Sequence, residues 1–224
     1  MNKTWYAYLL WALGAAALSF SIAAVFAGVF RLPRPMYLIP YIGLVSLFFY
    51  LYIRWSGLDL GSLLRHHWYW GLLGAVFVGF FMVRNILEQP ASPHPQGFWL
   101  IFDILWLGVL YGAVDGILLS VFPIITTRAA FTALGWTTHW YGKIGVGLLG
   151  LAASFITIIV YHLGYPECRS DVVFEIGGGQ SFVTATYLLA NNPFSAILSH
   201  MAMHIAGVLH GPATVMQLPP HYLP

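Results

Sequence analysis

Apolar residues in this chain fall into long, nearly uninterrupted runs, and short segments of charged residues, prolines and glycines separate the runs. A helix needs roughly 20 apolar residues to cross a bilayer, so each long run predicts a membrane-spanning helix. The long runs lie at about 5–30, 36–54, 68–87, 98–122, 143–163 and 194–216. A further run at about 180–191 is shorter and predicts a half-helix or a strongly tilted seventh span with its ends covered by protein.

The connecting segments carry turn formers and are too short to fold as separate domains. They read RLPRP at 31–35, EQPASPHPQ at 88–96 and LGYPECRSD at 163–171. The first apolar run is longer than the hydrophobic core of a secretory signal peptide, which favours a retained helix. Residues 1–224 therefore predict one integral membrane domain, an all-α polytopic bundle of six to eight transmembrane helices.

Composition supports this interpretation. Hydrophobic residues make up 59% of the chain and charged residues 7%, with a mean hydropathy of +0.78, whereas soluble domains have roughly 25% charged residues. The formal charge of +2 has no basic run, so nothing indicates a nucleic-acid partner. The single cysteine, Cys168, excludes an internal disulfide and a thiolate cluster. We expect an integral membrane protein, with the bacterial cytoplasmic membrane as its location.

Charged residues between the spans bear on orientation. Five basic residues fall on the side of the N-terminus and four on the other side, which also carries the acidic residues Glu167, Asp171 and Glu175. Because positive residues favour the cytoplasmic side, the pattern favours a cytoplasmic N-terminus.

One carboxylate lies deep inside a predicted span. Asp115 sits in GVLYGAVDGILLSVF, and no charged residue follows it before Arg128. A charge at this depth costs at least roughly 2.5–3.5 kcal/mol, which favours a functional role, although a hydrogen bond that fixes helix packing is the alternative. Tyr111 precedes Asp115 by one helical turn and is the expected hydrogen-bond donor to it.

Three histidines accompany this carboxylate on two other predicted spans. His200 and His204 share one face of the last helix, and His162 closes the fifth run. One carboxylate and three imidazoles suit a divalent transition metal, Zn²⁺ by ligand type, held by Asp115, His162, His200 and His204. The same groups can instead perform general acid–base chemistry on water without a metal. Packing roles for the histidines, or haem b held by imidazoles of two helices, are further alternatives.

Two segments, which together span about residues 150–210, resemble motifs of a known membrane family. TATYLLANNPFSAILSHMAMHIAGVLHG resembles the closing motif of the CPBP family, the CAAX-prenyl proteases and bacteriocin-processing enzymes, and LAASFITIIVYHLGYPE resembles its second motif. The family's first motif is Glu-Glu-x-x-x-Arg. In YGAVDGILLS, Asp115 is the only carboxylate and Leu119 stands where the arginine would be, while His204 stands where the family often has Asn.

The resemblance implies a CPBP-like fold, catalytic roles for His162 and His200, and peptidase-like activity on a hydrophobic or lipidated peptide. The leading hypothesis is a membrane-embedded hydrolase in which Asp115 and His162 activate water, aided or replaced by a metal on His200 and His204. Two other classes stay open: a subunit that carries haem or a metal, and an inactive accessory or scaffold subunit that binds partner subunits of a membrane complex.

Overall fold

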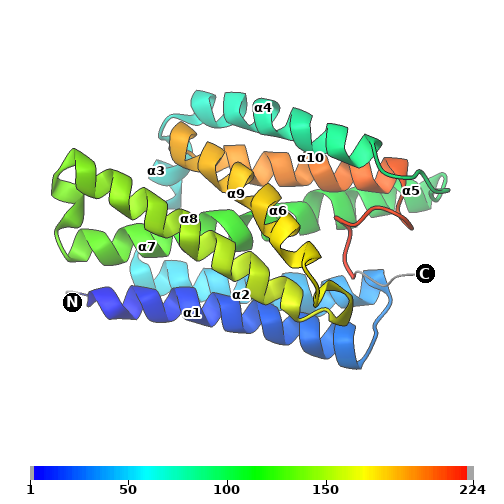
Figure 1. Ribbon diagram of the computed structural model, residues 1–224, viewed down its shortest axis with the longest axis horizontal. Helices are drawn as coiled ribbons and strands as arrows, with labels where there is room; N and C mark the ends of the chain where they lie inside the picture. The colour runs from blue at the N-terminus through cyan, green and yellow to red at the C-terminus, as the bar shows by residue number, and fades with distance from the viewer. Residues whose placement is uncertain (1–2, 221–224) are drawn as a thin grey trace.

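The structure is a computed structural model that describes residues 3–220, and it is all-α (Figure 1). Consecutive α and π segments run on without a break, so the described residues form eight helices, and no strand occurs among them. They are α1 Trp5–Ile22 with η1 Ala23–Val29, α2 Arg34–Ser56, α3 Leu60–Arg65, α4 Trp68–Leu87, the series α5 Phe98–Asp103, η2 Ile104–Tyr111, α6 Gly112–Gly116, η3 Ile117–Val121 and α7 Phe122–Ala133, then α8 Trp140–Leu163, α9 Val172–Ala190 and α10 Phe194–His210. Short 3₁₀ turns, η4 Trp136–Thr138 and η5 Pro166–Cys168, lie in two loops.

Five of these helices are long and apolar enough to cross a membrane. They are Trp5–Val29, Arg34–Ser56, Trp68–Leu87, Phe98–Ala133 and Trp140–Leu163. Each overlaps a predicted span, although the fourth helix continues to Ala133, beyond the predicted end at about 122. The overlap confirms the all-α transmembrane bundle and identifies the chain as an integral membrane protein.

The last two helices differ from the predicted runs. The short run at 180–191 belongs to α9, a helix of 19 residues, so the half-helix interpretation is wrong. Glu175 and three glycines interrupt the apolar pattern of α9 without interrupting the helix. The run at 194–216 is helical only to His210, because Gly211 leaves the helical conformation and Pro212 follows it.

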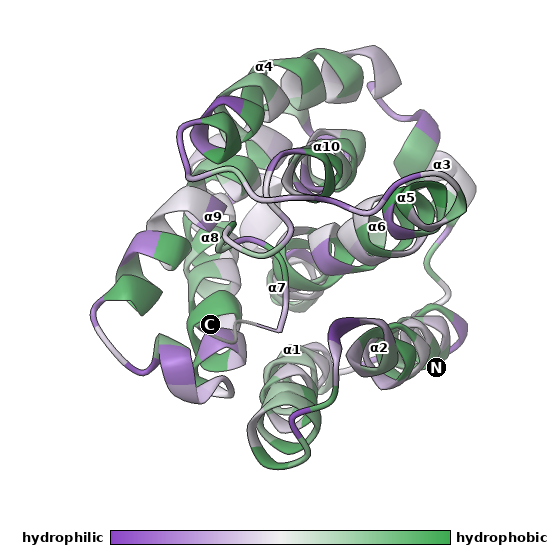
Figure 2. Ribbon diagram, turned by 90° about the vertical axis from the view of Figure 1, so that its right-hand side faces the viewer, coloured by the Kyte–Doolittle hydropathy of each residue, from purple (hydrophilic) through white to green (hydrophobic). Residues whose placement is uncertain are grey.

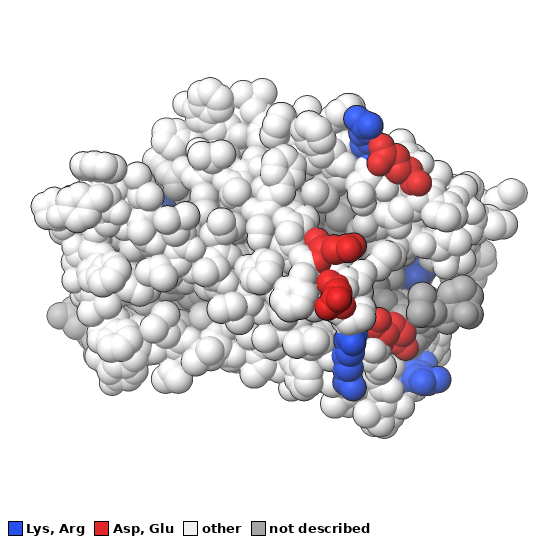
Figure 3. Space-filling model, in the orientation of Figure 1, with Lys and Arg blue, Asp and Glu red and all other residues white. Residues whose placement is uncertain are grey.

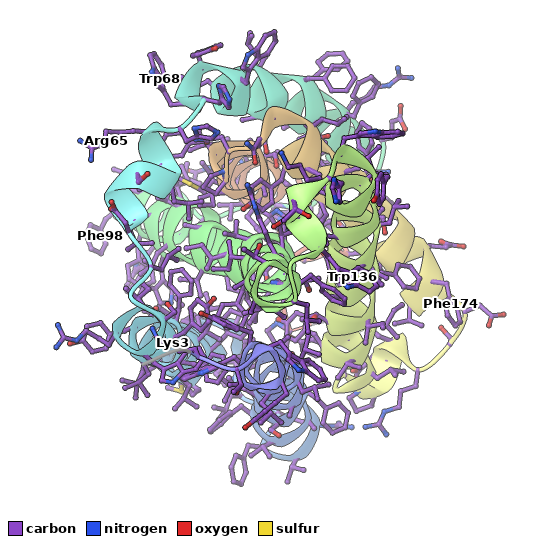
Figure 4. All side chains as sticks on the ribbon, turned by 90° about the vertical axis from the view of Figure 1, so that its left-hand side faces the viewer. Lys3, Arg65, Trp68, Phe98, Trp136 and Phe174 are labelled. Atoms are coloured by element: carbon purple, nitrogen blue, oxygen red, sulfur yellow. The ribbon has the colours of Figure 1, made fainter. Side chains whose placement is uncertain are left out.

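The seven long helices alternate in direction between the two ends of the bundle (Figure 1). One end holds Lys3 and the start of α4 at Trp68, and we call it the tryptophan end. The opposite end holds the start of α2 at Arg34, the start of α9 with Glu175, and the segment after α10, and we call it the acidic end. In Figure 4, which looks at the tryptophan end, the side chains of Arg65 and Trp68 point outward from the bundle, as interfacial anchors do. In Figure 3 the charged side chains visible on this face gather toward the acidic end.

Helix α10 lies inside the bundle, between α4 on one side and the η2–α6 segment on the other (Figures 1 and 2). Gly108, Gly112 and Gly116, spaced by four residues, face it. A Cβ on Gly108 would lie 2.7 Å from the Ile205 side chain, and one on Gly112 would lie 2.9 Å from the Met201 Cα. Small residues at this spacing let two helix backbones approach closely in a membrane. This glycine face therefore brings Asp115 within reach of α10.

A network of buried, hydrogen-bonded polar side chains connects α9, η3 and α8. The Gln180 amide donates to Ser120 Oγ at 2.5 Å, Ser120 and Thr184 share a bond of 2.9 Å, and Thr184 and Ser154 share one of 2.8 Å. Ser154 donates to the Leu119 carbonyl at 2.5 Å, so each hydroxyl must donate in the direction of Ser154. Every hydroxyl in this hydrogen-bonded network has its partners, and hydrogen bonds of this kind hold helices together in a membrane.

We predict that Gly112→Ala destabilises the protein by about 1–3 kcal/mol, because the added methyl group collides with the backbone of α10. Gly145→Ala is the matched control, since a Cβ on this α8 glycine meets nothing within 4 Å. The control should leave stability unchanged or raise it slightly. Equilibrium unfolding of both variants in bicelles measures the difference, and equal stabilities would contradict close packing of α6 on α10.

Candidate functional site

Asp115 lies on α6, a five-residue α-helical segment between the π-helical segments η2 and η3. π-helical turns are rare and occur frequently at functional sites, because they change which residues share a helix face. The carboxylate is 4% exposed. It therefore needs partners inside the protein, and the structure supplies them from two other helices.

Both oxygens of this carboxylate have polar neighbours. Tyr41 of α2 donates to Oδ1 at 2.7 Å. Oδ2 lies 3.8 Å from Nε2 of His200 and 3.6 Å from Nε2 of His204. The predicted donor, Tyr111, instead shares a 3.2 Å hydrogen bond with Tyr161. The hydrogen bond to Asp115 therefore comes from a helix 74 residues away in the chain.

In two of the histidines, a hydrogen bond to a backbone carbonyl determines which ring nitrogen carries the proton. Nδ1 of His200 lies 3.1 Å from the Ala196 carbonyl, and Nδ1 of His162 lies 2.9 Å from the Ile158 carbonyl. A carbonyl oxygen only accepts, so Nδ1 carries the proton and Nε2 is the acceptor of each neutral ring. In neutral His200, Nε2 and Asp115 Oδ2 are then two acceptors facing each other. A proton on one of them, or a donor between them, makes this arrangement favourable.

His204 is the least satisfied polar side chain of the site. It is 1% exposed, and among residues 3–220 neither of its ring nitrogens has a hydrogen-bond partner. The Tyr111 ring packs edge-on against it, with the ring centroids 4.7 Å apart. Burying an imidazole without partners is costly, so this position favours a bound water, ion or substrate group beside it.

A cavity of about 540 Å³ adjoins these groups, and Asp115, His162, His200 and His204 all line it. The structure thus brings the four predicted residues to one cavity, with Asp115 placed directly against His200 and His204. His162 is 6% exposed and belongs to the cavity wall. Among residues 3–220 no group of three or more His, Cys, Asp and Glu side chains is arranged to hold a metal ion, and metal ligation stays a prediction.

Sequence reasoning missed a cluster of buried tyrosines beside the carboxylate. Tyr37 and Tyr165 share a hydrogen bond of 2.5 Å, and Tyr165 and Tyr161 share one of 2.6 Å. The Tyr41 ring packs on Tyr111 with centroids 5.1 Å apart. The available signal was spacing, because Tyr37 and Tyr41 lie four residues apart on α2, as the histidines do on α10, and Tyr165 follows Tyr161 by four residues just beyond the end of α8.

The lone cysteine takes no part in this site. Cys168 lies in η5, outside the spans, and burial raises the pKa of its thiol to about 11. Because the thiolate is the nucleophilic form, this residue is inert at neutral pH.

No protein-family model matches the chain, and no curated protein or solved structure is significantly similar to it.

We predict that Tyr41→Phe lowers stability by about 1.5–3 kcal/mol, because it removes the hydrogen bond to a buried carboxylate. Tyr50→Phe, on an exposed position of the same helix, is the control and should change stability by less than about 0.5 kcal/mol. Equilibrium unfolding in bicelles measures both. A Tyr41 variant as stable as its control would show that Asp115 does not depend on this donor.

Proposed function

We propose that this protein is a membrane-embedded hydrolase of CPBP-like type, with Asp115 as the carboxylate that activates water. The observation that carries the proposal is the position of Asp115 Oδ2, 3.6 and 3.8 Å from two imidazole nitrogens at the wall of an internal cavity. The motif resemblance around His162 and His200 points to the same chemistry. The location that we propose is the bacterial cytoplasmic membrane.

The geometry suits a water molecule between the carboxylate and an imidazole. Two acceptors this far apart can both bond to one water at about 2.8 Å each. Tyr41 occupies Oδ1 and leaves Oδ2 to act as the base. The imidazoles of His200 and His204 restrict where the water can lie, which aligns it for attack.

The proposed reaction is hydrolysis of an amide bond in a hydrophobic or lipidated peptide. Oδ2 takes a proton from the water while the water oxygen adds to the carbonyl carbon. The C–N bond of the tetrahedral intermediate then breaks, and the proton passes to the departing amine. His162, whose Nδ1 is held by the Ile158 carbonyl, is proposed to relay this proton through Nε2.

The mechanism as written uses no metal, because Asp115 itself takes the proton from the water. A metal-assisted form of the same hydrolase remains the second candidate, and the unpartnered nitrogens of His204 favour it. The separations of 3.6 and 3.8 Å are also close to the roughly 3.4 Å between neighbouring ligands of a tetrahedral zinc ion.

We predict that Asp115→Asn lowers hydrolysis by a factor on the order of 10²–10⁴ with little loss of stability, because it removes the base and keeps the shape. A panel of prenylated and hydrophobic peptides supplies the substrates. Asp103→Asn is the control, since Asp103 lies near the start of the same helical series and does not line the cavity.

If wild-type protein cuts no member of the panel, and Asp115→Asn instead loses stability or a co-purifying partner, Asp115 is structural and the accessory-subunit hypothesis replaces the hydrolase.

Chelation separates the metal-free form from the metal-assisted one. A metal that binds only the folded protein raises its melting temperature, so removal of the metal by a chelator should lower it. We predict that His204→Ala abolishes any such sensitivity. The metal-assisted form is ruled out if elemental analysis finds no metal in the purified protein and the chelator leaves the melting curve unchanged.

A further inference from the structure

The charges on the wall of the cavity all have one sign. Asp115 lies deep inside it and Glu175 at its outer part, and neither lysine nor arginine is among its described lining residues. The position at which the CPBP motif has arginine is Leu119, which also lines the cavity. The wall therefore provides no cation for a phosphate headgroup or a peptide carboxylate.

Exposed residues of α4 and α9 take part in the lining of the cavity. Phe81 of α4 lines it and is 42% exposed, and Gly179 of α9 lines it and is also exposed. Phe81 lies within a helix that is long and apolar enough to cross a membrane, so we expect its exposed side to face the bilayer. Apolar side chains such as Met82, Ile176 and Met203 continue the wall toward the histidines. An apolar chain can therefore enter from the membrane and reach the polar end.

Amide groups and a carboxylate surround the outer part of the cavity. Gln217 bonds to Gln89 at 2.9 Å and to Asn85 at 3.1 Å, and all three line the cavity with Glu175. Glu175 is exposed in the first turn of α9, four residues after Asp171, so it lies at the acidic end of the bundle, where α9 begins. A carboxylate at this interfacial depth attracts an ammonium or guanidinium group.

The deep end supplies independent evidence that something binds. His204 lines the cavity, is 1% exposed, and has no hydrogen-bond partner for either ring nitrogen among the described residues. Such an orphaned polar group indicates a ligand with a polar group at this depth.

From these observations we propose that the cavity binds a hydrophobic peptide segment bearing a basic residue, with the apolar part between α4 and α9 and the basic side chain at Glu175. This inference rests on the proposed function for the identity of the substrate class as a peptide. It adds a selection by charge: the cavity accepts basic amphiphiles and rejects acidic ones.

Two fluorescent lipopeptides in phosphatidylcholine nanodiscs test the selection. Both carry the same palmitoyl chain and fluorophore, and one has two lysines where the other has two glutamates. We expect saturable binding of the lysine form and weaker binding of the glutamate form. Glu175→Gln should weaken binding of the lysine form about fivefold, the effect of an ion pair of about 1 kcal/mol at a wet interface. Asp171→Asn, a neighbouring acid outside the cavity lining, should not.

A pair of adjacent glycines tests the route between α4 and α9. A Cβ on Gly178 or on Gly179 meets nothing within 4 Å, so a side chain can start at either position without a clash, yet only Gly179 lines the cavity. Gly179→Leu should abolish binding of the lysine lipopeptide, and Gly178→Leu should preserve it. Equal effects of the two leucines, equal affinity for both lipopeptides, or the absence of saturable binding would each overturn the proposal.

Binding and cleavage are measured separately, which keeps this inference distinct from the hydrolase proposal. If charge-selective binding occurs and the wild type cleaves nothing, only the hydrolase proposal fails. If cleavage occurs without charge preference, only the present inference fails.

Discussion

The carboxylate of Asp115 imposes the main physical constraint on this bundle. A carboxylate with 4% exposure in the middle of an apolar helix is expensive unless hydrogen bonds and nearby positive or polar groups compensate it. Tyr41 satisfies one oxygen, and α10 brings two imidazoles to the other. That approach is possible because the helix that carries Asp115 presents glycines to α10. The π-helical segments on either side of α6 place the carboxylate and these glycines on compatible faces. Packing and chemistry therefore depend on the same few turns.

Hydrophobic patterning was sufficient to predict the presence of the five most apolar helices, because length and apolar content alone identify a membrane-spanning helix. It failed for α9, where Glu175 and the glycines at 177–179 lower the hydropathy of a helix that the surrounding helices support. It also extended α10 into the segment after His210. That segment is apolar for another reason, since Val215 and Leu218 pack into the bundle without being helical. Apolar content reports burial or lipid contact, and it does not report conformation.

The residues of the candidate site could be predicted from the sequence, but the hydrogen bonds between them could not. Asp115, His200 and His204 were identifiable because polar groups deep in an apolar run are rarely accidental. The partner of Asp115 was not, because a periodicity argument finds neighbours one turn away, such as Tyr111, and cannot find Tyr41 on a distant helix. The π-helical segments were equally invisible, since they arise from how the helix packs and have no sequence signature of their own.

The proposed resemblance to the CPBP motifs gives the positions that differ from them a common electrostatic consequence. In that proposed resemblance, Leu119 stands where the motif has an arginine beside the carboxylate, and His204 stands where the motif often has an asparagine and is a group that can become a cation. An arginine charge is permanent, whereas an imidazole beside Asp115 Oδ2 acquires its charge only by taking a proton. The negative charge of Asp115 is therefore balanced only when an imidazole holds a proton. A permanent cation would stabilise the charged carboxylate and make its protonation more costly, so proton transfer to Asp115 is easier beside an imidazole. The outer part of the cavity, with Glu175 and no basic side chain in its described lining, is left to attract positive charge from outside. For the proposed function, Leu119 and His204 favour proton transfer at the deep end, and Glu175 favours the proposed basic ligand at the outer part of the cavity.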